Sequence, residues 1–200
     1  MSDASPESYD ADDDALASID FPDDEYTVVQ SLIRNKYKAM DSAGNVVLRG
    51  KQKMFKLKEE FPFVDGDGNP AFTVKAAGML DIAGNYVLTD DATGEEVVVL
   101  DKNWTFFVDR WVLRDPDTGA EIATINSKSK VVAALRHLVG LFQILPHKYE
   151  ITDADGDHVG SIDGKFSFKD KYVIRVDDTS DVPKEAVIAG AMVIDAIEGN

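Results

Sequence analysis

The chain has 200 residues, of which 44% are hydrophobic and 9% aromatic, so it can bury the core of one domain and is not globally disordered. The absence of cysteine excludes disulfides, thiolate zinc sites and thiol nucleophiles, and it fits a cytoplasmic location. A net charge of −16 argues against nucleic-acid binding through phosphate neutralisation, and no apolar run approaches the ~20 residues of a transmembrane helix.

The N-terminal segment is the most acidic part of the chain. Residues 1–26 contain ten acidic residues and no lysine or arginine, whereas the rest contains 27 acidic and 21 basic residues. Like charge with few apolar residues predicts that residues 1–25 form a disordered acidic tail and that residues 26–200 form a single domain. The excess of Asp over Glu is typical of halophilic proteins, but an acidic tail and many Asp-Gly turns explain it equally well, so both interpretations stay open.

One pattern recurs along the domain after a first predicted strand near residues 26–33. An aromatic residue opens a stretch of alternating apolar and polar residues, Asp follows four positions later, and Gly follows at position seven or eight. This pattern predicts a strand that ends in a tight turn. The five copies are Tyr37…Asp41…Gly44, Phe61…Asp65…Gly68, Tyr86…Asp90…Gly94, Trp111…Asp115…Gly119 and Tyr149…Asp153…Gly156.

Each copy is followed by a second apolar run, such as residues 46–48 after the first and 97–100 after the third. The sequence therefore predicts five β-hairpins, because Asp and Gly tolerate the positive φ angles of tight turns. The hairpins supply ten strands. The strand near 26–33 and a last strand near 171–177 bring the number to twelve.

Two segments depart from the alternation. Val131, Leu135 and Leu138 fall on one helical face, so a helix is expected at about 129–145. Residues 184–197 follow a proline and carry apolar residues on every face. A helix that is apolar all round must be buried all round, and this one is too short to span a bilayer.

Together these elements predict a mainly β fold with two helices. The expected architecture is a closed twelve-stranded antiparallel meander barrel around a central apolar C-terminal helix, with one extra helix inserted at about 129–145. Twelve strands enclose a lumen that is wide enough to hold a helix.

The hairpin repeats, together with the short apolar helix at 187–197, resemble the LURP-one-related family. The resemblance covers roughly residues 26–198 and rests on the fivefold recurrence at about 24 residues and on the terminal helix. It implies the tubby C-terminal-like fold, which the phospholipid scramblases share, but it supplies no catalytic residues. Tubby proteins bind phosphoinositides through basic side chains, and that property carries over only as an analogy of fold.

The sequence offers little for catalysis or for a cofactor. It has no nucleophile elbow, no His-Glu-x-x-His pattern and no phosphate-binding glycine loop. The turns at 65–69 and 153–157 space their oxygen ligands as calcium loops do, but both lack the glycine and glutamate that complete such a loop. We therefore predict a non-enzymatic protein without a cofactor or metal ion, in which these segments are turns.

Basic residues gather in one stretch of this acidic protein. Arg49, Lys51 and Lys53 share one face of a predicted strand, further lysines follow after a change of phase, and others lie on the preceding strand. Such a patch can bind an anionic headgroup, although lysines that protect and balance a barrel face give the same pattern. The candidate headgroup- or ligand-binding residues are Arg34, Lys36, Lys38, Arg49, Lys51, Lys53, Lys56 and Lys58.

Three functions are consistent with these observations. The preferred one is a non-enzymatic barrel that binds a ligand or protein partner or acts as a scaffold. The alternative is a peripheral protein that binds anionic phospholipid, or a scramblase-like protein, in contact with the membrane surface but without a transmembrane segment. An enzyme is the third, and the sequence supports it least.

Overall fold

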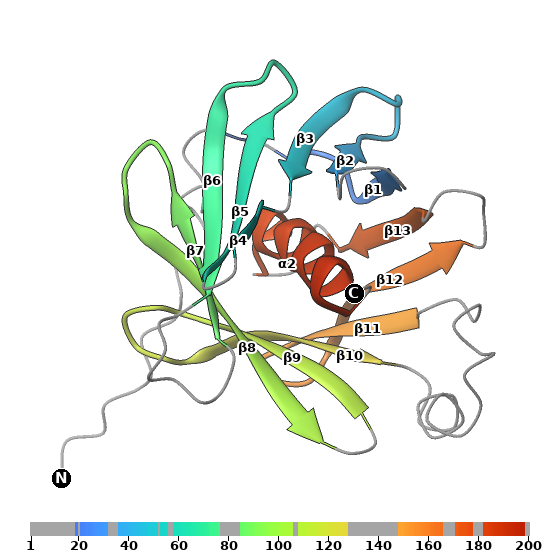
Figure 1. Cartoon of the computed structure of the whole chain (residues 1–200). Coiled ribbons are helices and arrows are strands. Elements are labelled where there is room, and N and C mark those ends of the chain that lie inside the picture. Colours follow the sequence, from blue (N-terminus) through green and yellow to red (C-terminus); the bar gives the residue numbers. More distant parts are fainter. Residues whose placement is uncertain are drawn as a thin grey trace, which may run out of the picture.

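The computed structural model describes residue 19 and residues 21–31, 36–51, 53–55, 58–76, 85–105, 108–127, 148–165, 171–177 and 182–198. These residues form a mainly β fold with one helix (Figure 1). The elements are β1 (Glu25–Ser31), β2 (Lys36–Met40), β3 (Val46–Lys51), β4 (Lys53–Phe55), β5 (Lys58–Asp65), β6 (Pro70–Ala76), β7 (Tyr86–Asp90), β8 (Glu96–Thr105), β9 (Val108–Arg114), β10 (Glu121–Ser127), β11 (Lys148–Asp153), β12 (His158–Lys165), β13 (Lys171–Val176) and α2 (Lys184–Glu198).

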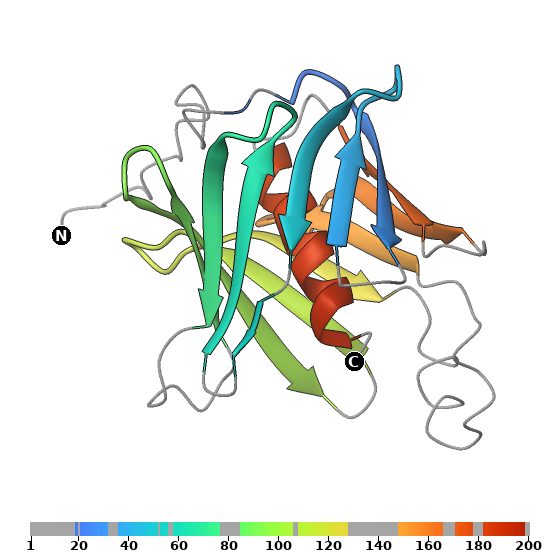
Figure 2. The same ribbon diagram turned by 45° about the horizontal axis from the view of Figure 1, so that its top comes forward.

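Two strand pairings close the strands into a barrel. One joins the first and last strands of the chain, and the other joins strands near the two ends of the sheet. β1 pairs with β13, and β3 pairs with β5, each antiparallel. β3 and β4 follow one another along β5, since Leu48 lies opposite Asp65 and Lys53 opposite Glu60. They share one position in the ring, which therefore has twelve positions, and the predicted closed antiparallel meander barrel is confirmed (Figures 1 and 2).

All five predicted turns lie at the same end of the barrel because successive strands alternate in direction. We call this end the turn rim; it comprises residues 41–45, 65–69, 90–95, 115–120 and 153–157. The glycine in each turn has a positive φ, for example 98° at Gly68, where a residue with a Cβ would be strained. Asp65 Oδ1 accepts the backbone N–H groups of Asp67, Gly68 and Asn69 at 2.6–2.9 Å. These are the turn bonds that the sequence predicts.

The core lies between the inner faces of the strands and α2. On β2 the alternation is visible directly, since Tyr37 and Ala39 are buried while Lys36 and Lys38 are exposed. Residues 186–194 of α2 are all buried, and in both views α2 runs through the space that the strands enclose (Figures 1 and 2). The inserted helix predicted at about 129–145 lies outside the described residues. In the described part of the chain, no helix is both long and apolar enough to cross a bilayer.

A short segment before β1 packs onto the turn rim, and we call residues 19 and 21–24 the rim strap. Ile19 and Phe21 belong to the core cluster, with 9% and 3% exposure. Asp23 Oδ2 accepts the backbone N–H and the hydroxyl of Ser42 at 2.8 and 2.6 Å. The Lys184 ammonium at the start of α2 donates to an oxygen of the Asp24 carboxylate at 3.0 Å. Packing onto the barrel therefore begins before Tyr26, the residue at which the sequence predicts the domain to start.

Candidate functional site

The structure places most of the predicted basic residues on β2 to β5. Two of the eight, Arg34 and Lys56, lie outside the described residues. The others are Lys36 and Lys38 on β2, Arg49 and Lys51 on β3, Lys53 on β4 and Lys58 at the start of β5.

The register between β2 and β3 brings four of these residues together as two pairs. Lys36 lies opposite Lys51, and Lys38 lies opposite Arg49. Residues directly opposite on antiparallel strands share a face, with Cβ atoms about 4.5–5.5 Å apart. Because Tyr37 and Gly50 are buried, Lys36, Lys38 and Arg49 lie on the outer face of the barrel, and Lys51 holds the register position opposite Lys36. We call Lys36, Lys38, Arg49 and Lys51 the basic face.

The members of the basic face differ in what holds them. The Arg49 guanidinium donates to the carbonyl oxygens of Asp65, at 3.2 Å, and of Gly66. It therefore joins β3 to the turn that follows β5. Lys36 and Lys38 are exposed, and in the described part of the chain neither takes part in an ion pair.

The remaining two described residues lie further along, on β4 and β5. Lys53 is the register partner of Glu60 across β4 and β5. Lys58 lies opposite Phe55. The register along β5 continues from β3 to β4 without a shift, since Gly50 lies opposite Phe63 and Lys53 opposite Glu60.

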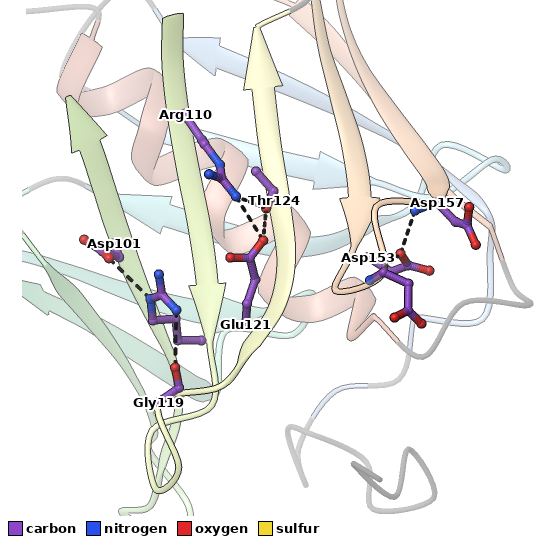
Figure 3. A network of polar contacts seen from close by, with 9 residues as sticks. Asp101, Arg110, Gly119, Glu121, Thr124, Asp153 and Asp157 are labelled. Atoms are coloured by element: carbon purple, nitrogen blue, oxygen red, sulfur yellow. Dashed lines mark hydrogen bonds and ion pairs between the residues drawn. The ribbon is translucent and has the colours of Figure 1, made fainter. Parts of the chain in front are cut away.

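Two arginines elsewhere in the described barrel form ion pairs with acidic residues. The Arg175 guanidinium contacts the carboxylate of Glu25, its neighbour across β1 and β13, at 2.8 Å. Arg110 reaches Glu121 at 3.0 Å, and the same carboxylate accepts the Thr124 hydroxyl at 2.6 Å (Figure 3). A like-charge pair in direct register is destabilising, so the two such pairs of the basic face stand apart from this pattern.

The turn rim forms the acidic end of the molecule. Hydrogen bonds from the Asn69 side chain and backbone hold the pKa of Asp65 below its usual value. The Thr118 hydroxyl and backbone N–H do the same for the pKa of Asp115. Figure 3 shows another member of this end, Asp153, whose carboxylate accepts the backbone N–H of Asp157 at 2.8 Å. Within the described residues, no three acidic or histidine side chains are grouped as metal ligands.

Sequence reasoning missed one neighbour of the basic face. Lys171, the first residue of β13, lies opposite Val29 of β1, and Val29 also lies opposite Lys38. The nearest residue of the basic face in the sequence is Lys51, 120 positions away. Only the pairing of β1 with β13 brings them close, and no local pattern signals that pairing.

Comparisons with known proteins address the family and the fold. The sequence pattern of the LURP-one-related family matches residues 46–195. The fold is similar to that of an Arabidopsis thaliana protein solved by X-ray crystallography, with a TM-score of 0.55 and 11% sequence identity. That similarity covers 87% of this chain and 91% of the plant protein. No match was found among curated proteins.

Proposed function

The chain belongs to the LURP-one-related family, and from this premise we propose that it is a non-enzymatic binding module whose basic face contacts an anionic partner. The observation that carries the proposal is the register of β2 and β3, which places basic residues opposite one another twice, Lys36 opposite Lys51 and Lys38 opposite Arg49. The chain has 37 acidic residues against 21 basic ones. In the described part of the chain Lys36 and Lys38 form no ion pair, and an anionic partner would neutralise such a face.

The interior of the barrel supports a contact on the outer surface rather than a ligand in the lumen. The core cluster combines residues from the strands with those of α2, including Val187 and Val193 at 0% exposure. In this proposal α2 is the central helix of the barrel and occupies the space in which a ligand would otherwise sit. Binding is then left to the outer wall, where the exposed lysines Lys36 and Lys38 of β2 lie.

The test compares two single substitutions that change the net charge equally. Lys36→Glu alters the basic face, and Lys75→Glu alters an exposed lysine of β6 that lies opposite Glu60. The probes are phosphatidylserine vesicles and poly-glutamate, each at low ionic strength, with cosedimentation and fluorescence anisotropy as readouts. We expect at least one probe to bind the parent protein and Lys36→Glu to weaken that binding more than Lys75→Glu does. The proposal is wrong if neither probe binds or if the two variants weaken binding equally.

A further inference from the structure

The rim strap binds three elements that lie far apart in the sequence. Asp23 Oδ2 accepts the backbone N–H and the hydroxyl of Ser42, in the turn between β2 and β3, at 2.8 and 2.6 Å. The Asp24 carbonyl oxygen accepts the backbone N–H of Val176, at the end of β13, at 3.1 Å. The Lys184 ammonium donates to the Asp23 carbonyl oxygen at 3.3 Å and to the Asp24 carboxylate at 3.0 Å. The turn, the last strand and the helix therefore meet at this segment, at the top of Figure 2.

The strap is held in two different ways along its length. Its first half is apolar, and Ile19 and Phe21 lie in the core cluster. Its second half is polar and lies at the surface, where the side chain of Asp24 is 65% exposed. A charge added at the surface acts on polar bonds and leaves buried apolar contacts unchanged. The bonds of Asp23 and Asp24 are therefore the part of the strap that a surface modification can alter.

Ser42 is the exposed residue on the barrel side of these bonds. The hydrogen bonds from its hydroxyl and its backbone N–H, and then the charge of Lys184, hold the pKa of Asp23 below its usual value. The Ser42 hydroxyl thus faces an ionised carboxylate at neutral pH. The hydroxyls of Thr93 and Thr118 on the turn rim bond within their own turns instead. Of these three rim hydroxyls, only that of Ser42 bonds to the strap.

We propose that Ser42 is a phosphorylation site and that a phosphate on it releases the rim strap from the turn rim. The inference does not depend on the proposed function, because it involves no residue of the basic face. In the reaction a protein kinase joins Ser42 Oγ to the terminal phosphorus of a nucleoside triphosphate. The bond from that phosphorus to the bridging oxygen breaks, a nucleoside diphosphate leaves, and the hydroxyl proton passes to the catalytic base of the kinase. The product has no hydroxyl to donate to Asp23 and carries about two negative charges at pH 7.

The charged groups near this phosphate act against the strap. The Asp23 carboxylate, which lies 2.6 Å from the hydroxyl oxygen, repels it. Asp41, the preceding residue, and Glu185, in the first turn of α2, add further negative charge at this end of the barrel. Lys184 attracts the phosphate, and a phosphate that binds this ammonium takes it from Asp24. Repulsion and competition therefore both break bonds of the strap, while the positively polarised start of α2 keeps an anionic partner.

The experiment measures how often the strap opens, in the full chain with phosphoserine inserted at position 42 during translation. An endoproteinase that cleaves before aspartate cuts at Asp23 and Asp24 only when these residues leave the barrel, and mass spectrometry identifies the cut. A hydrogen bond to a charged group shifts such an equilibrium by about tenfold, so we expect cleavage there about ten times faster than in the parent. Phosphatase treatment should restore the rate of the parent.

Two variants separate the added charge from other effects. Ser42→Ala removes the hydroxyl but keeps the backbone N–H bond, so we expect cleavage to rise by less than about threefold. Ala43→Glu adds charge at the next exposed residue of the same turn, and we expect less than about a twofold rise. Hydrogen exchange of the Val176 amide, which is bonded to Asp24, gives a second readout that should follow the same order.

Several results would overturn the inference. Equal cleavage of the phosphoserine protein and the parent means that phosphate does not release the strap. Equal cleavage of the phosphoserine protein and Ser42→Ala removes the role given to the charge, and equal cleavage of Ala43→Glu removes the role given to the position. Phosphopeptide mapping of the protein purified from its own cells tests the site itself: phosphate on Ser42 supports the inference, and an unmodified Ser42 contradicts it. The proposed function is decided separately, by the Lys36→Glu comparison.

Discussion

Replacing Phe21 by alanine tests whether the rim strap is part of the folded domain. The Phe21 side chain is 3% exposed, and its ring meets that of Tyr26 edge to face with 5.2 Å between centroids. A buried phenylalanine removes about 200 Å² from water, which corresponds to about 5 kcal/mol at ~25 cal/mol per Å². Residual compactness of the unfolded chain lowers this value. We therefore expect Phe21→Ala to reduce the free energy of unfolding by about 3 kcal/mol.

The measurement is urea unfolding of the full chain, followed by circular dichroism, with a thermal scan beside it. For a chain of 200 residues, a loss of this size lowers the Tm by about 6–12 °C. Deletion of residues 1–18 is the matched control. It removes six acidic residues but leaves Ile19 and Phe21 in place, so we expect the free energy of unfolding to change by less than about 0.5 kcal/mol.

One result would refute this reasoning. If Phe21→Ala unfolds within about 0.5 kcal/mol of the parent, the rim strap adds nothing to stability and the domain begins at Tyr26, as the sequence predicts. Limited proteolysis gives an independent readout, because a packed strap stops cleavage before Ile19 and an unpacked one allows it up to β1.

Three further predictions concern the core, a close backbone approach and the turn rim. Val193→Asp places a carboxylate at a position with 0% exposure, so we expect a loss above about 5 kcal/mol and aggregation on expression; a soluble, cooperatively unfolding variant would contradict the burial of α2. A Cβ at Gly160 would overlap the carbonyl oxygen of Arg175. Gly160→Ala should therefore lower the free energy of unfolding, measured by urea titration, by about 2 kcal/mol. An unchanged free energy of unfolding would show that β13 can shift away from residue 160. Because the pKa of Asp65 is lower in the folded state, its ionised carboxylate stabilises the protein above pH ~4, and this stabilisation is lost as the pH falls through the folded-state pKa. Asp65→Asn should therefore flatten the dependence of the free energy of unfolding on pH below pH ~4. An unchanged dependence would refute this prediction.

The sequence alone predicted the elements whose signals are local. Each hairpin combines a period-two strand with a turn residue pattern only a few positions long, as in Phe61 to Gly68, so β5 and β6 could be predicted from their own residues. The apolar helix at 184–197 matches α2, Lys184–Glu198, because its composition does not depend on its partners. The number of strands followed from these local units, and closure into a ring followed from the need to bury that helix.

The tertiary structure decided which residues face one another. The partner of Lys53 is set by the register of β3 and β4 along β5, which places it opposite Glu60. Likewise, Lys171 joins Lys38 only through the register of β1 on β13, which pairs residues more than 140 positions apart. Ile19 and Phe21 lie in an acidic segment whose composition hides their burial. Register and packing between distant segments are set by the whole core at once, so no window of sequence contains them.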